Sequence, residues 1–140
     1  MNKILSLSNI KKSYITINNY VEALKDITFS VNEGEFIALV GPSGCGKSTL
    51  LDIIANLEES DEGKIIFQNN TKVGYMFQQD ALFPWLSIID NCTLENVISK
   101  NTNNKKYVLE LLKKYDLYDF KDKYPSSLSG GMKQRVACIK

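Results

Sequence analysis

The chain contains 140 residues, of which 44% are hydrophobic and 24% are charged, a balance that suits one packed domain and argues against disorder. Its net charge of +1 lacks the basic excess that is typical of general nucleic-acid-binding proteins. Histidine is absent and the three scattered cysteines form no CxxC pair, which excludes a Ser-His-Asp triad and the common zinc-finger patterns.

The first third of the chain is predicted to form strands, because apolar and polar residues alternate over residues 3–7 and 23–31. A turn is expected at residues 32–35, and the continuous apolar run at 36–40 is typical of a parallel strand buried on both faces. From Lys47 the apolar residues recur at the spacing of a helix. The face of this helix is expected to consist of Leu50, Leu51, Ile54 and Leu57.

The second half of the chain changes from strands to helices. Strands are predicted at residues 64–68 and 73–77, and the latter is again of the buried type and ends at Gln78. The predicted helices cover residues 87–98, 105–115 and about 131–140. Polar connections are expected at residues 58–63, 69–70, 99–104 and 124–131.

Between the first buried strand and the first helix, the sequence matches the phosphate-binding pattern GxxxxGK[ST]. Its glycines let successive N–H groups point inward as an anion cradle, and the helix adds the positive end of its dipole. We expect Lys47 to reach the β- and γ-phosphates, the Ser48 hydroxyl to bind Mg²⁺, and Thr49 to lie near the α-phosphate. Chance gives this pattern roughly 0.005 times in a chain of this length, which disfavours a glycine turn without a ligand. The expected nucleotide-binding residues are Gly41, Pro42, Ser43, Gly44, Cys45, Gly46, Lys47, Ser48 and Thr49.

A second motif lies at the start of the last predicted helix, where a serine and two glycines present a hydroxyl and free N–H groups to an anion. By itself this segment is more typical of a loop that ends in an N-cap serine. The motif consists of Leu128, Ser129, Gly130, Gly131 and Met132.

These motifs together carry a resemblance to a family. Residues 41–49 resemble the Walker A motif of ABC-transporter ATPase subunits, residues 128–132 resemble their LSGGQ signature, and Phe77-Gln78 resembles the strand end that carries their Q-loop glutamine. Met132 departs from the glutamine that is usual in the family. The stretches 77–91 and 124–137 look more like the branch that imports nitrate, sulfonates, taurine and related solutes, in which this methionine is common.

The resemblance implies an α/β fold of the P-loop NTPase type, with an incomplete RecA-like core, an N-terminal antiparallel β part and a helical insert. The whole chain would then be part of an ABC-type nucleotide-binding domain. Its expected divisions are a β-rich part at 1–35, the P-loop core and Q-loop at 36–80, and a helical subdomain with the signature at 81–140.

The resemblance also implies roles for single residues. In a head-to-tail dimer of ATPase subunits, the signature residues 128–132 would contact the ATP held by the other subunit, with Ser129 and Gly131 facing its γ-phosphate. Gln78 would touch Mg²⁺ or the attacking water. Tyr14 is the candidate for stacking on adenine, with Tyr20 as its rival and packing in the core as the alternative.

The implied cofactors are ATP and Mg²⁺, and the implied partners are a second ATPase subunit, the transmembrane permease subunits and, indirectly, a solute-binding protein, but no nucleic acid. The chain is expected to be cytoplasmic and peripheral on the inner face of the cell membrane, since no apolar run is long enough to span it. The apolar segment 83–86 fits equally a contact with the permease and packing in a satellite core.

Three family elements have no counterpart in the sequence: the Walker B aspartate, the glutamate beside it and the downstream histidine. In the family they follow the signature helix. We therefore expect the N-terminal part of a truncated, split or incompletely sequenced subunit, which by itself is inactive. Two alternatives stay open: a non-hydrolysing remnant, and a soluble ABC ATPase that acts on nucleic acid or ribosomes. The compact helical insert without coiled-coil heptads favours the transporter.

Overall fold

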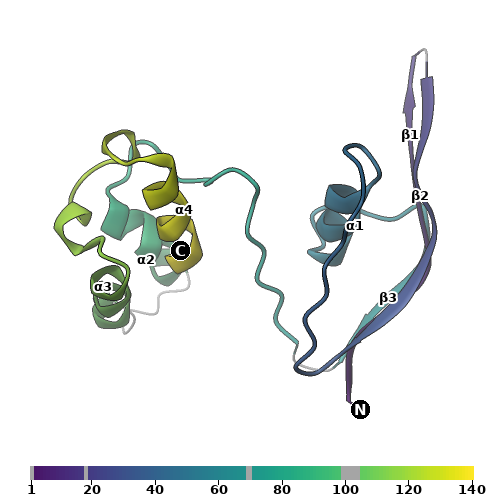
Figure 1. Cartoon of the computed structure of the whole chain (residues 1–140), viewed down its shortest axis with the longest axis horizontal. Coiled ribbons are helices and arrows are strands. Elements are labelled where there is room, and N and C mark those ends of the chain that lie inside the picture. The colour runs from purple at the N-terminus through teal and green to yellow at the C-terminus, as the bar shows by residue number, and fades with distance from the viewer. Residues whose placement is uncertain (1, 18, 69–70, 99–104) are drawn as a thin grey trace. The chain divides into compact units, whose positions relative to one another are not determined.

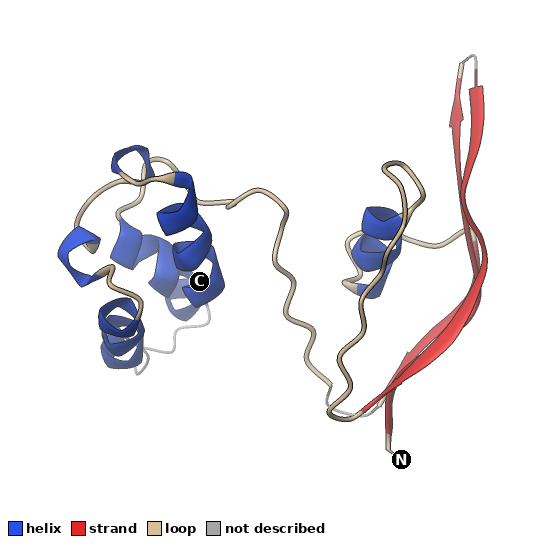
Figure 2. Cartoon of the chain, in the orientation of Figure 1, coloured by secondary structure: helices blue, strands red, loops and turns tan. Residues whose placement is uncertain are grey.

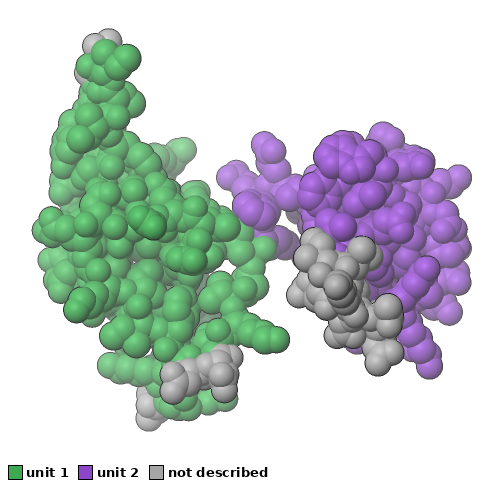
Figure 3. Space-filling model, turned by 180° about the vertical axis from the view of Figure 1, so that it is seen from behind, with its two compact units in different colours: residues 1–75 green, residues 76–140 purple. Residues whose placement is uncertain are grey.

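The computed structural model describes residues 2–17, 19–68, 71–98 and 105–140. The chain divides into two compact units, Met1–Tyr75 and Met76–Lys140 (Figure 3). The predicted connections at 69–70 and 99–104 lie outside the described residues. Within the described ranges, no helix has both the length and the apolar character that crossing a membrane requires.

The first unit is built on an antiparallel sheet in the order β2-β1-β3 (Figure 1). Its strands are β1 (Lys3–Thr16), β2 (Asn19–Asn32) and β3 (Glu62–Phe67). Three of the five predicted strands, at residues 3–7, 23–31 and 64–68, are therefore confirmed. The first two are longer than the alternating pattern indicates, because they form one hairpin whose far end continues beyond the part that packs on a helix.

The hairpin is bent where its register shifts, and polar side chains fix the bend. Asn9 and Asp26 both have left-handed backbone angles, and Asn9 Nδ2 donates to Asp26 Oδ1 at 2.7 Å. Here β3 approaches β1 so closely that a Cβ on Gly63, whose φ is +95°, would lie 2.5 Å from the Asn9 carbonyl oxygen. Only glycine fits this crossing.

The helix α1 (Lys47–Ile54) packs on this sheet through an apolar core. Its buried members are Leu7, Ile10, Leu24, Leu50 and Ile53. The predicted face is only partly right: Leu50 is buried and Ile54 packs at the edge of the core, but Leu51 and Leu57 are exposed. The helix ends at Ile54, so Leu57 lies past its last turn, and Ile53 takes the buried place one turn after Leu50.

The two predicted parallel strands are wrong. Residues 35–42 and 71–77 run without strand pairing and are drawn as loop in Figure 2. Phe36 is 94% exposed and Val40 is 92% exposed. A parallel strand needs hydrogen-bonded neighbours and covered faces, and no described strand pairs with either segment. The second segment is instead tied to α1 by a hydrogen bond from the Tyr75 hydroxyl to Asp52.

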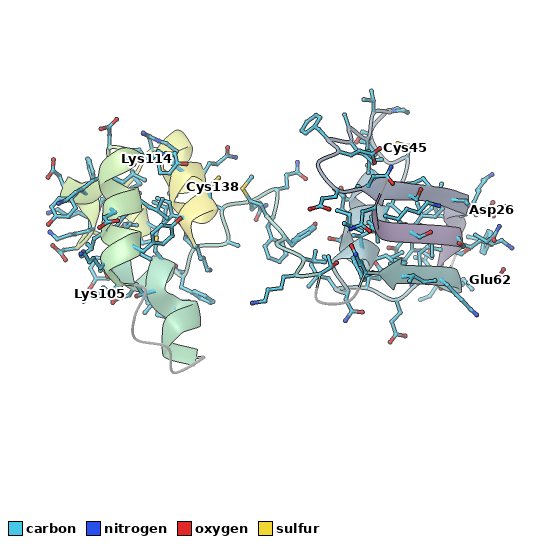
Figure 4. All side chains as sticks on the ribbon, turned by 90° about the horizontal axis from the view of Figure 1, so that it is seen from below. Asp26, Cys45, Glu62, Lys105, Lys114 and Cys138 are labelled. Atoms are coloured by element: carbon cyan, nitrogen blue, oxygen red, sulfur yellow. The ribbon has the colours of Figure 1, made fainter. Side chains whose placement is uncertain are left out.

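The second unit is helical, as predicted. It contains α2 (Ile88–Ile98), α3 (Lys105–Lys114), α4 (Gly130–Ile139) and two short 3₁₀ turns, η2 (Tyr118–Phe120) and η3 (Pro125–Ser127). The helices surround one apolar core, whose buried members are Ile88, Ile89, Cys92, Val108, Leu112, Leu117, Leu128, Val136 and Ile139. Burial raises the pKa of the Cys92 thiol to about 12 although Lys140 lowers it, so this thiol acts as a small apolar group. Cys45 and Cys138, labelled in Figure 4, are exposed, and all three thiols are free.

Candidate functional site

The loop that leads into α1 has a backbone shape that only glycine permits. Gly44 and Gly46 have φ angles of +81° and +88°. A Cβ on Gly46 would lie 2.3 Å from the carbonyl oxygen of Ala23 on β2. The loop therefore lies directly against the hairpin at Gly46, where a side chain has no room.

The first turn of α1 is open to an outside acceptor. Gly46 is its N-cap and supplies no side-chain cap, and the first intrahelical hydrogen bond runs from Leu50 N to Gly46 O at 2.9 Å. The N–H groups before Leu50 have no acceptor within the helix, and the helix dipole adds positive potential in front of them. Ser48 is exposed and Thr49 is half-buried in this turn. Such a helix start attracts an anion.

Lys47 brings the positive charge of its side chain back over the loop. Its Nζ donates to the carbonyl oxygens of Gly41 at 2.8 Å and Pro42 at 2.6 Å, and it lies 3.4 Å from Cys45 Sγ. These neutral acceptors hold the ammonium at the mouth of the loop, where a phosphate would be a stronger, charged acceptor. The loop, the helix start and Lys47 thus form a cradle that suits a phosphate chain.

The hairpin separates the two candidate tyrosines. Tyr14 pairs with Val21 and Tyr20 with Ile15, so the two rings project from opposite faces of the ribbon. The Tyr14 hydroxyl donates to Glu58 at 2.8 Å and lies 3.5 Å from Thr49 Oγ1. Tyr14 therefore reaches the first turn of α1.

The surroundings of the two rings differ as well. The Tyr20 hydroxyl lies 3.0 Å from Ser13 Oγ, and Tyr20 as a residue is 63% exposed, against 38% for Tyr14. The Lys12 ammonium lies 5.6 Å from the centroid of the Tyr14 ring. The hydrogen bond to Thr49 lowers the pKa of Tyr14, but burial and the bond to Glu58 outweigh it, so the pKa is raised and the hydroxyl stays protonated.

In the second unit, the signature-like motif forms the start of α4. Ser129 is the N-cap, and its Oγ accepts from Met132 N at 3.4 Å. Leu128 is buried and Met132 packs on the core from its edge, so these two side chains anchor the motif. A Cβ on Gly130 or Gly131 would meet nothing within 4 Å. The space before both glycines is therefore open to an incoming group.

Gln78 is exposed in a bend of the second unit. The structure therefore brings Tyr14 to the P-loop helix within the first unit, whereas Gln78 and the signature-like motif belong to the second. The described residues contain no group of three or more histidine, cysteine, aspartate or glutamate side chains that could hold a metal ion. Ser48, exposed beside the cradle, fits as the protein ligand of a metal that is bound mainly by phosphate oxygens.

The apolar segment 83–86 is partly packed and partly exposed. The rings of Phe83 and Trp85 lie 5.3 Å apart, and the Lys140 ammonium lies 4.4 Å from the Phe83 centroid. Phe83 is half-buried, but Trp85 is 69% exposed. Sequence analysis missed Asn91, which is fully buried under this segment, and Glu58, which binds Tyr14. A polar residue between the apolar positions 88, 89 and 92 of a helix was the available signal for Asn91.

The chain is similar to known proteins in family, in sequence and in structure. A family model described as "ABC transporter" matches residues 24–140. An uncharacterized ABC transporter ATP-binding protein of Bacillus subtilis, YtlC, is 43% identical over 95% of this chain and 54% of its own length. The aliphatic sulfonates import ATP-binding protein SsuB of Zymomonas mobilis is 40% identical over 98% of this chain and 57% of its own length. The chain thus spans about half the length of these curated relatives.

Among solved structures, the post-hydrolysis dimer of the ATP-binding cassette MJ0796, bound to ADP and Pi, superposes with a TM-score of 0.83. The two chains are 33% identical, and the match covers 97% of this chain and 68% of the other. This likeness confirms the predicted fold class, a P-loop NTPase cassette with an N-terminal antiparallel sheet and helices, of which the structure covers part.

Proposed function

The chain belongs to the ABC transporter family, and we propose that it is the ATP-binding subunit of an importer, which couples ATP binding and hydrolysis to the uptake of a small solute such as a sulfonate, taurine or nitrate. The observation that carries the proposal is the P-loop, in which Lys47 is held over the uncapped start of α1. The sulfonate-import name of a relative at 40% identity supports the class of solute.

In this proposal the loop residues 41–49 bind the phosphates of ATP. Their N–H groups and Lys47 hold the β- and γ-phosphates, and the Ser48 hydroxyl is the ligand that the chain offers to Mg²⁺. Mg²⁺, when bound, neutralises charge on the phosphate oxygens. Gln78 would touch Mg²⁺ or the attacking water, as the resemblance implies. Hydrolysis of ATP would then remove the γ-phosphate, so the protein groups that contact it would no longer be held together.

We further propose that two subunits pair head to tail, so that residues 128–132 of one face the nucleotide of the other. Support comes from the open space before Gly130 and Gly131 and from the dimeric state of the structural neighbour. Because each subunit supplies both halves of a site, such a pair closes with two-fold symmetry.

The permease subunits are the second proposed partner, and they would hold the ATPase on the inner face of the membrane. The exposed Trp85 beside the half-buried Phe83 supports a docking face at residues 83–86, because an aromatic anchor on a packed base is typical of interface hot spots. A solute-binding protein would act only through the permease.

Tyr14, rather than Tyr20, is proposed to stack on adenine, because its hydroxyl reaches Thr49 and Glu58 beside the P-loop helix. Tyr14→Ala is expected to weaken ATP binding roughly tenfold, since stacking of a base on an aromatic ring is worth about 1–3 kcal/mol. Calorimetric titration measures the affinity. Tyr14→Phe keeps the ring and should stay within about twofold of the wild type, as should Tyr20→Ala. A loss of affinity confined to Tyr20→Ala would reverse the assignment.

Transport coupling is tested with the intact subunit and its permease in lipid vesicles that enclose the solute-binding protein. We expect phosphate release from ATP to rise when an aliphatic sulfonate is added on the binding-protein side. Residues 1–140 alone should release no phosphate, because the sequence has no counterpart of the Walker B aspartate or of the glutamate beside it. If RNA or ribosomes stimulate phosphate release instead, the soluble ABC ATPase that acts on nucleic acid or ribosomes is favoured. If the complex assembles but releases no phosphate, the non-hydrolysing remnant is favoured.

A further inference from the structure

Asn91 is the one buried polar side chain in the described part of the chain, with 0% of its surface exposed. Its Oδ1 accepts from Phe83 N at 2.8 Å. Its Nδ2 donates to the carbonyl oxygens of Phe83 at 3.1 Å, Leu86 at 3.1 Å and Ser87 at 3.0 Å. One carboxamide therefore binds the backbone on both sides of a five-residue segment.

The segment that Asn91 binds is a tight turn. Leu86 N donates to the Phe83 carbonyl oxygen at 3.1 Å, which closes a turn over residues 83–86. Pro84 occupies the second position of this turn, where its fixed φ is favoured. Trp85 occupies the third position, at the exposed tip. The fully buried amide is thus the base of the turn that projects the tryptophan.

The turn at residues 83–86 is attached to the helical unit through the start of α2. At the start of α2, Ile88 N donates to Lys123 O at 2.9 Å and Ile89 N donates to Lys121 O at 2.8 Å. The backbone of Asn91 belongs to the first turn of α2, because its N–H donates to Ser87 O at 2.9 Å. The turn is therefore attached to a fixed helix end and is not an independent loop.

We propose that Asn91 is a positioning residue, which holds the turn at residues 83–86 in the one shape that presents Trp85 to the permease; this inference rests on the proposed function. A carboxamide suits the task because it supplies one acceptor and two donors in one plane. Alanine leaves Phe83 N and three carbonyls without this partner. Aspartate keeps the acceptor but puts a charge beside the carbonyl oxygens.

Trp85 is the single tryptophan of the sequence, so its fluorescence reports on the turn without any partner. In the subunit by itself, with Trp85 kept as its sole tryptophan, Asn91→Ala and Asn91→Asp should give Trp85 faster anisotropy decay and about twofold stronger quenching by iodide, because the turn is released. The matched control is Thr93→Val, which removes the bond from Thr93 Oγ1 to Ile89 O within the same helix. It should leave both signals unchanged. A thermal melt of each variant separates this release from general unfolding.

Binding of the same variants to the detergent-solubilised permease completes the test. Trp85→Ala and both Asn91 variants should weaken binding at least roughly tenfold, and Thr93→Val should not. Unchanged Trp85 anisotropy in Asn91→Ala would overturn the inference. It would also be overturned if the Asn91 variants release the turn but bind the permease normally, while Trp85→Ala weakens permease binding. If Trp85→Ala binds the permease normally, the docking face proposed at residues 83–86 is wrong. A released turn in the Asn91 variants would then still show that Asn91 holds the turn.

Discussion

Lys47→Ala is expected to weaken ATP binding by roughly 10- to 100-fold and to abolish hydrolysis in the intact subunit. The Lys47 ammonium is the side-chain charge that the P-loop holds at its mouth, between the carbonyl oxygens of Gly41 and Pro42. A charge-assisted hydrogen bond contributes about 1.5–3 kcal/mol, and each 1.4 kcal/mol corresponds to about a tenfold change in affinity. Calorimetric titration with ATP and a phosphate-release assay measure the two effects.

The control for this change is Lys105→Ala, which removes the same charge from an exposed position at the start of α3. It should bind ATP like the wild type, because Lys105 is not part of the P-loop and its exposed charge is screened at physiological salt. In Lys47→Ala the exposed carbonyl oxygens of Gly41 and Pro42 lose the ammonium but can bind water instead, so the melting temperature should change little. An unchanged dissociation constant for Lys47→Ala would contradict the P-loop assignment itself.

The P-loop was predictable because its pattern encodes a local backbone shape. Gly46 illustrates this: its φ of +88° is a backbone angle that glycine adopts readily and other residues rarely do. Two helices were predictable for a similar reason: the apolar residues Val108 and Leu112 of α3 recur at the helical period, and Ser129 marks the start of α4 as its N-cap. In both cases neighbours in sequence determine the outcome.

The failures concern features that depend on distant partners. An apolar run such as residues 36–40 predicts burial only if other strands flank it, and its Phe36 and Val40 are exposed in this structure. The choice between Tyr14 and Tyr20 depends on the register of the hairpin, which the alternating pattern leaves undefined. Asn91 was missed for a different reason: its partners are close in sequence, but they are backbone groups, which a sequence does not distinguish.

Ser129→Arg is expected to abolish ATP-driven dimerisation and hydrolysis while the subunit keeps its own affinity for ATP. Ser129 is exposed at the start of α4, and the space before Gly130 and Gly131 is open. Arginine fills that space, which in the proposed head-to-tail pair receives the other subunit's nucleotide. The lost N-cap costs only about 1 kcal/mol, so the helical unit should remain folded.

Size-exclusion chromatography with and without ATP measures the dimer, and titration measures the affinity of the monomer. Gln134→Arg is the matched control, because it adds the same side chain at an exposed position further along α4. Ser129→Ala removes the weak cap to Met132 N without adding bulk, and it should still dimerise. If Ser129→Arg forms the ATP-dependent dimer as readily as Gln134→Arg, the open face of α4 does not receive a second subunit, and the composite site must be abandoned for this chain.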